Sequence, residues 1–174
     1  VDSMSEADEI YVLDTGSTDK TVKMLKKRGV NVVVKKFKTW RFDVARNVSL
    51  ELVPDDADLC VCTDLDEVFE AGWRKKLEEN YDKSTRVRYN YNWRLDESNN
   101  PIVNFYLDKI HSRKNYKWVN PVHEILQYTG DNEVFVTTDY ITVNHYPDDS
   151  KSRGSYLPLL ELSVLENPEN DRNM

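Results

Sequence analysis

The chain has 174 residues, with 39% hydrophobic and 32% charged side chains and a formal net charge of -7. This length suits one domain with a sizeable core, and the composition is that of a soluble globular protein. The acidic charge argues against a nucleic-acid groove, which needs a clustered basic face. No apolar run approaches the roughly 18 residues of a membrane helix, so we expect no transmembrane segment.

The first half alternates predicted strands with predicted helices. We expect strands at residues 9–13, 30–34 and 58–63, and helices at residues 20–28, 42–52 and 71–79. Thr18 or Asp19 can cap the first helix, and Gly29 ends it. This order predicts a parallel α/β sheet with right-handed crossovers. In such a sheet the loops after the first and third strands, at Asp14 and Asp64, open on the same edge.

The second half has a different pattern. Apolar and aromatic residues alternate with polar ones over residues 87–94, a turn follows at 99–101, and the alternation continues at 103–107, which predicts a long hairpin. Residues 116–119, 133–137 and 140–144 add strand-like segments, and residues 152–165 have helical spacing before a polar tail. The aromatic stripe of Tyr89, Tyr91 and Trp93 suits core packing better than sugar stacking.

The two cysteines, Cys60 and Cys62, are two residues apart on one predicted strand. Two cysteines at this spacing on one strand are poorly placed to form a disulfide with each other, so we expect both to be reduced residues of the core. The chain begins without a basic-then-apolar leader. Together these features predict a cytoplasmic setting.

An apolar run ends abruptly in three carboxylates, those of Asp64, Asp66 and Glu67. In extended geometry Asp64 and Asp66 point to one side of the strand, where their charges repel unless a cation lies between them. A hard divalent ion with oxygen ligands is the natural partner. The alternative is a solvated acidic turn that precedes the next helix.

Two other groups in the first half suit a nucleotide. Asp14 lies at a strand end, where it can accept hydrogen bonds from a base or ribose, and Gly16 lets a ligand approach the backbone. An ordinary capped turn is the alternative. Arg46, on a predicted helix, can reach a phosphate, or it can form an exposed ion pair.

The histidines give weaker indications of a functional site than the acidic groups do. His123 and His145 lie beside polar or acidic residues, and Glu124 follows His123. A lone histidine is more often a packed or exposed residue than a ligand. His111 has no such neighbours, and we expect no function for it.

Three motifs together resemble the inverting family 2 glycosyltransferases. They are Asp14-Thr15-Gly16-Ser17-Thr18-Asp19-Lys20-Thr21, Ala45-Arg46-Asn47 and Thr63-Asp64-Leu65-Asp66-Glu67. The segments Val122-His123-Glu124 and His145-Tyr146 match more loosely. The resemblance implies the GT-A fold, an α/β architecture whose parallel or mixed sheet is flanked by helices, with an antiparallel hairpin region in the second half.

The resemblance also implies a domain organisation. Residues 1–174 form a single glycosyltransferase domain, in which 1–80 is a nucleotide-binding half that lacks its first strand. Residues 81–150 are the acceptor side, and 151–174 are a C-terminal helix and tail.

The resemblance further implies transfer of a sugar from a nucleotide sugar, expected to be UDP-linked, to a glycan, lipid-linked or protein acceptor. A Mn²⁺ or Mg²⁺ ion bridges the diphosphate, and Glu124 is the general base. The nucleotide contacts it implies are Asp14, Ser17, Asp19, Arg46 and Asp64, and the metal ligands are Asp66 and His145. The alternatives are a nucleotidyltransferase of sugar phosphates and a non-catalytic glycan- or nucleotide-binding module.

Overall fold

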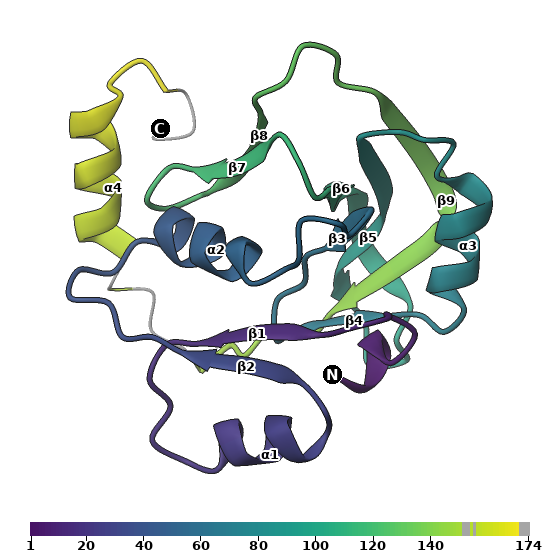
Figure 1. The fold of residues 1–174 in the computed structure, drawn as a ribbon, viewed down its shortest axis with the longest axis horizontal. Helices are drawn as coiled ribbons and strands as arrows, with labels where there is room; N and C mark the ends of the chain where they lie inside the picture. The colour runs from purple at the N-terminus through teal and green to yellow at the C-terminus, as the bar shows by residue number, and fades with distance from the viewer. Residues whose placement is uncertain (151–153, 155, 171–174) are drawn as a thin grey trace. The chain divides into compact units, whose positions relative to one another are not determined.

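The computed structural model describes residues 1–150, 154 and 156–170 (Figure 1). The chain divides into two compact units, each built from three segments. The first, the five-stranded unit, comprises Val1–Ile10, Asp55–Asn115 and Gly130–Asp149. The second, the loop-bearing unit, comprises Tyr11–Pro54, Tyr116–Thr129 and Ser150–Met174.

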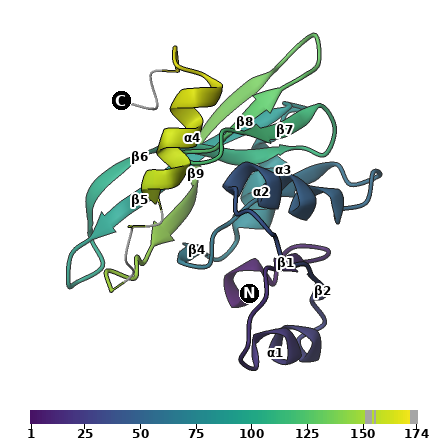
Figure 2. The same cartoon turned by 90° about the vertical axis from the view of Figure 1, so that its left-hand side faces the viewer.

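The five-stranded unit contains one mixed sheet in the order β3-β6-β5-β9-β4. Its elements are a 3-10 turn at Asp2–Met4, β3 (Leu59–Val61), β4 (Glu67–Phe69), α3 (Trp73–Asn80), β5 (Arg86–Leu95), β6 (Pro101–Ser112) and β9 (Phe135–His145). β5 and β6 form the long antiparallel hairpin seen in Figure 2, and β9 pairs parallel with β5. The two short strands close the edges, each antiparallel to its neighbour.

One hydrophobic core holds this unit together. Val87, Ile110, Ile141 and Val143, all from the three central strands, are fully buried. Trp73 of α3 packs into the same core, and its indole N–H donates to the Ser3 carbonyl at 2.9 Å, so this large ring is buried with its polar atom satisfied.

In the loop-bearing unit, β1 (Tyr11–Asp14) and β2 (Asn31–Val34) pair in parallel, and α1 (Thr21–Lys27) connects them. Gly29 ends the helix in a left-handed conformation (φ 75°). Gly29 N–H donates to the Lys26 carbonyl and Val30 N–H to the Leu25 carbonyl, the two bonds of a Schellman motif. This is the helix end that the sequence predicted.

The same unit holds α2 (Phe42–Glu51), the antiparallel pair β7 (Tyr116–Val119) and β8 (Ile125–Tyr128), and α4 (Tyr156–Glu166). Asn47 of α2 exchanges two hydrogen bonds of 2.8 Å with the backbone of Trp118, so its amide continues the hydrogen bonding of the β7 edge. Arg41, just before α2, binds Glu166 of α4 through both guanidinium NH₂ nitrogens, at 2.5 and 3.0 Å.

The predicted fold class is confirmed, since the structure is a mixed α/β fold with a long antiparallel hairpin. Each predicted helix and strand of the first half is present, with ends that differ by a few residues. Two short strands, β4 and β8, were missed. The segments predicted at 133–137 and 140–144 form the single strand β9, which has a register shift opposite Tyr89 and Asn90 that interrupts the alternation.

One topological prediction is wrong. The third strand of the first half does not extend a parallel sheet with β1 and β2, because β3 pairs antiparallel with β6. Alternation of strands and helices gives the order of elements, but it does not say which edge each strand joins.

Part of the predicted helix at 152–165, and the end of the predicted tail, lie outside the described residues. Within the part of the chain that is described, every helix is too short or too polar to cross a bilayer.

The fully buried Ile141 gives a test of the core. Ile141→Ala should lower the free energy of unfolding by about 3 kcal/mol, because it removes apolar contacts and leaves a cavity. The matched control is Ile102→Ala, since Ile102 is 60% exposed on the hairpin and should change stability by less than about 0.5 kcal/mol. Urea denaturation of both variants measures the difference, and equal losses would contradict the assigned core.

Candidate active site

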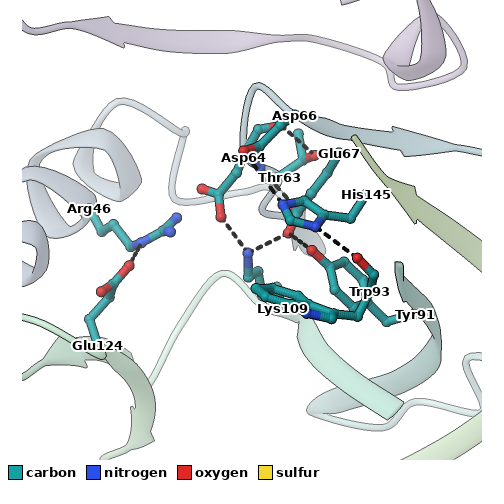
Figure 3. Close-up of polar contacts among 10 residues, drawn as sticks. All are labelled: Arg46, Thr63, Asp64, Asp66, Glu67, Tyr91, Trp93, Lys109, Glu124 and His145. Atoms are coloured by element: carbon teal, nitrogen blue, oxygen red, sulfur yellow. Dashed lines mark hydrogen bonds and ion pairs between the residues drawn. The ribbon is translucent and has the colours of Figure 1, made fainter. Parts of the chain in front are cut away.

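The three acids after β3 are held by a loop that Glu67 closes (Figure 3). The Glu67 side chain is only 2% exposed, and its Oε2 accepts the Asp64 backbone N–H at 2.8 Å. Glu67 N–H in turn donates to the Asp64 carbonyl at 3.2 Å. Glu67 therefore fixes the loop, and Asp64 and Asp66 are the acids that are more open to solvent.

Lys109, from the facing strand β6, neutralises two of these acids. Its Nζ lies 2.6 Å from Asp64 Oδ2 and 2.7 Å from Glu67 Oε1. Tyr91 O–H donates to the same Glu67 oxygen at 3.0 Å. Burial, and secondly the Glu67 charge, raise the pKa of Tyr91, so this phenol remains a neutral donor. Sequence reasoning missed Lys109 altogether, because a single lysine in an alternating strand gives no local signal.

Strand pairing brings Asp66 and His145 together. β4 pairs with the end of β9 so that Glu67 lies opposite His145, and Tyr146 N–H donates to the Asp66 carbonyl at 2.7 Å. His145 Nε2 lies 3.5 Å from Asp66 Oδ2. The other ring nitrogen, Nδ1, lies 3.1 Å from the Trp93 carbonyl, which can only accept, so Nδ1 carries the proton. In the neutral ring the Nε2 lone pair therefore faces Asp66.

The Trp93 ring also steadies this histidine. The indole and imidazole centroids are 4.6 Å apart and their planes differ by 21°, a stacked arrangement. A backbone acceptor and an aromatic face together fix the rotamer and tautomer of His145, as second-layer contacts do around metal-binding histidines. One imidazole nitrogen, His145 Nε2, and one carboxylate oxygen, Asp66 Oδ2, thus lie 3.5 Å apart. The described residues contain no group of three or more histidine, cysteine or acidic side chains that could hold a metal ion.

The Asp14 loop, in the loop-bearing unit, is a tight turn. Asp14 Oδ1 accepts the backbone N–H groups of Gly16 (3.0 Å) and Ser17 (2.9 Å), and Gly16 has a φ of 120° that favours glycine. These bonds, led by the one from the Ser17 side chain, lower the pKa of Asp14. Asp19 accepts the Thr21 N–H at 2.9 Å, and bonds from Thr21 lower the pKa of Asp19. The N-cap of α1 is Lys20, which makes no side-chain cap bond, so the predicted cap at Thr18 or Asp19 is wrong and Asp19 binds the first helical N–H from one position further out. The nucleotide contacts of this loop remain a prediction.

Arg46 and Glu124, predicted separately, form an ion pair in the same unit. Arg46 Nε donates to Glu124 Oε1 at 2.5 Å (Figure 3). The guanidinium also lies 4.7 Å from the Trp118 ring centroid. The Glu124 side chain is 13% exposed. The residue before it, His123, has a positive φ of 52°, a conformation that L-residues rarely adopt. Strain of this kind persists only where the surroundings enforce it, and it is concentrated at functional sites.

His111, for which we expected no function, is fully buried and has polar partners. Its Nδ1–H donates to the Ser112 carbonyl at 2.7 Å, so Nε2 accepts from the Cys62 thiol at 3.5 Å. Burial lowers the pKa of His111 to about 4, and the ring is neutral at physiological pH. Cys60 and Cys62 are both free thiols, as predicted. His111 is therefore a buried structural histidine.

The structure is thus an α/β fold in which acidic side chains follow strands β1 and β3, and His145 lies 3.5 Å from one of these acids, Asp66. The model of glycosyl transferase family 2 matches residues 1–143, which is most of the chain. The chain belongs to this family and is a glycosyltransferase, as the motifs indicated. No curated protein matches the chain.

The buried carboxylate of Glu67 gives a test of the acidic loop. Glu67→Gln should lower the free energy of unfolding by about 2–3 kcal/mol, because Lys109 loses a charged partner inside the protein. The double variant Glu67→Gln with Lys109→Met should be less destabilised than the sum of the two single variants. Thermal and urea unfolding of the wild type, the two single variants and the double variant complete this double-mutant cycle. Strict additivity of the two losses in stability would contradict the ion pair.

Proposed function

We propose that the protein transfers a sugar from a UDP-sugar to an acceptor hydroxyl with inversion at the anomeric carbon, assisted by a divalent metal ion. The observation that supports this most directly is the pairing of Asp66 with His145, whose Nδ1–H is committed to the Trp93 carbonyl. This leaves His145 Nε2, 3.5 Å from Asp66 Oδ2, as the ring nitrogen that can bind a metal ion. Membership of the family supplies the reaction class.

In this proposal Asp66 and His145 hold the metal ion. Mn²⁺ and Mg²⁺ keep several water and phosphate ligands in nucleotide enzymes, so two protein donors are sufficient. Because Mg²⁺ binds almost exclusively oxygen, an imidazole in the set favours Mn²⁺. When bound, such an ion stabilises the negative charge that develops on the leaving diphosphate.

Asp64 has a separate role in the nucleotide contact. Lys109 already occupies its Oδ2 at 2.6 Å, which makes this carboxylate a poorer metal ligand than Asp66. A carboxylate held in a fixed orientation is well suited to accept hydrogen bonds from the ribose hydroxyls. We assign Asp14, Ser17, Asp19 and Arg46 to the nucleotide on the family resemblance, and the tight turn at Asp14 agrees with an ordered binding loop.

Glu124 is the proposed general base. It takes the proton from the acceptor hydroxyl while that oxygen attacks the anomeric carbon and the bond to the diphosphate oxygen breaks. One displacement of this kind inverts the configuration. The ion pair with Arg46 fixes the direction of the carboxylate, and a positioned carboxylate is what general-base catalysis requires.

The domain organisation and the cellular location are part of the same proposal. Residues 1–80 carry the donor contacts and residues 81–150 the acceptor side of a single domain. The two free thiols favour a cytoplasmic location, where such thiols remain reduced. The acceptor is a glycan, a lipid-linked molecule or a protein.

Replacing the metal ligand should separate metal-dependent binding from folding. Asp66→Ala should abolish the Mn²⁺-dependent part of UDP binding in calorimetric titrations with and without Mn²⁺, because one of two protein donors is lost. Its melting temperature should stay near that of the wild type, since the Asp66 side chain is one-third exposed. The exposed Asp56 provides the control Asp56→Ala, which should bind as the wild type does. Equal Mn²⁺-dependent binding by Asp66→Ala would overturn the metal assignment.

The general base gives a second test. Glu124→Gln keeps a side chain that can accept from Arg46 but cannot take a proton, so transfer should fall at least 100-fold while UDP binding is retained. The measurement is UDP release from UDP-sugars in the presence of an acceptor, beside calorimetric binding of UDP. Glu161→Gln, an exposed position on α4, is the control. Unchanged turnover in Glu124→Gln would rule out this role.

A further inference from the structure

The aromatic stripe of β5 divides into two parts with different surroundings. Tyr89 and Tyr91 are buried, at 0% and 3% exposed, as a core role predicts. Trp93, next in the same alternation, is 43% exposed, and Phe105 on the paired strand is 44% exposed. Two large rings therefore remain open to solvent where polar residues would be less costly, and their exposure calls for a partner.

A β-bulge sets the direction of Trp93. In the β5–β6 pairing Asn92 lies opposite Asn104 and Arg94 lies opposite Val103, so two steps along β5 match one step along β6. Trp93 is the extra residue. Bulges of this type turn a side chain away from the regular alternation and are frequent beside active sites.

The two exposed rings are continuous with the proposed metal pair. Phe105 lies 5.4 Å from the Tyr91 ring and 6.3 Å from the Trp93 ring, and Trp93 stacks on His145 at 4.6 Å. His145 Nε2 is 3.5 Å from Asp66. A row of aromatic surfaces therefore leads from the hairpin to the ligands of the proposed metal ion, all within the five-stranded unit.

We propose that Trp93 and Phe105 form a platform on which a carbohydrate acceptor stacks, so that the acceptor of this glycosyltransferase is a glycan. The inference rests on the proposed function, which puts the reacting centre next to His145. A pyranose ring presents C–H groups that adjacent oxygens make slightly positive, and these pack on the negative faces of aromatic rings. Its hydroxyls meanwhile stay in water.

The size and borders of the platform favour a sugar over a lipid chain. Beside the two rings, Val103 is 43% exposed, its pairing partner on β5 is the charged Arg94, and the histidine that stacks on Trp93 pairs with the charged Asp66. An acyl chain needs a longer apolar groove to leave water. Flat rings with charged neighbours suit a ligand that is apolar on its faces and polar at its rim.

The test uses the full chain and neutral oligosaccharides as probes. The probes are the tetrasaccharides of β1,4-glucose, β1,4-N-acetylglucosamine and α1,4-glucose, followed through the indole N–H signals in ¹⁵N NMR spectra. The Trp93 signal is assigned by Trp93→Phe. We expect at least one probe to shift it in a saturable manner, and Phe105→Ala to weaken that binding at least 10-fold.

Two controls separate this inference from the proposed function. Ile102→Ala removes an exposed apolar side chain from the opposite face of the same strand and should bind the probes as the wild type does. Phe105→Ala should keep Mn²⁺-dependent UDP binding. If the wild type itself shows no Mn²⁺-dependent UDP binding, that result contradicts the metal site alone. A detergent micelle and a peptide are tested beside the oligosaccharides. The platform is overturned if no oligosaccharide shifts the Trp93 signal, including the case in which only the micelle or the peptide shifts it. It is also overturned if Phe105→Ala binds the oligosaccharides as tightly as the wild type does.

Discussion

The acidic loop depends on one buried charge, the carboxylate of Glu67. Taking a carboxylate out of water costs several kcal/mol unless charged and hydrogen-bonding partners replace the solvent. Three partners do so here: the Lys109 ammonium, the Tyr91 hydroxyl and the Asp64 backbone N–H. Because Tyr91 and Lys109 come from β5 and β6, the loop is tied to the central hairpin of its sheet. The positions of Asp64 and Asp66 follow from this anchor.

The loop-bearing unit fixes its own residues in a similar way. Glu124 is held by Arg46, and Arg46 is held by the face of Trp118. Asn47, the next residue of α2, binds the backbone of that tryptophan in both directions. Arg46 and Glu124 are therefore oriented by protein contacts before any ligand arrives. Such preorganisation reduces the free energy that a substrate must supply to order the site.

Local patterns predicted much of this molecule, and long-range pairing accounts for what they missed. Turn chemistry at Gly29, alternation in β5 and the acids after β3 were all visible in the sequence, since each depends on neighbours within a few residues. Lys109 could not be predicted, because its partners are 42 and 45 residues away. β4 was missed for a related reason: three residues carry too little periodicity, and only pairing with β9 makes them a strand. The aromatic stripe predicted a core, and the bulge at Trp93 changed the outcome for its last member.

The pairing of β4 with the end of β9 has a consequence for how the chain can vary. Side chains on a strand alternate between the two faces of the sheet, so His145 faces Asp66 only while its distance from the register shift near residues 139–141 is kept. The residues between can change identity and leave the pair intact. A single inserted or deleted residue there would turn the imidazole to the opposite face. The donor pair is thus specified by the number of residues in the strand as much as by which residues they are.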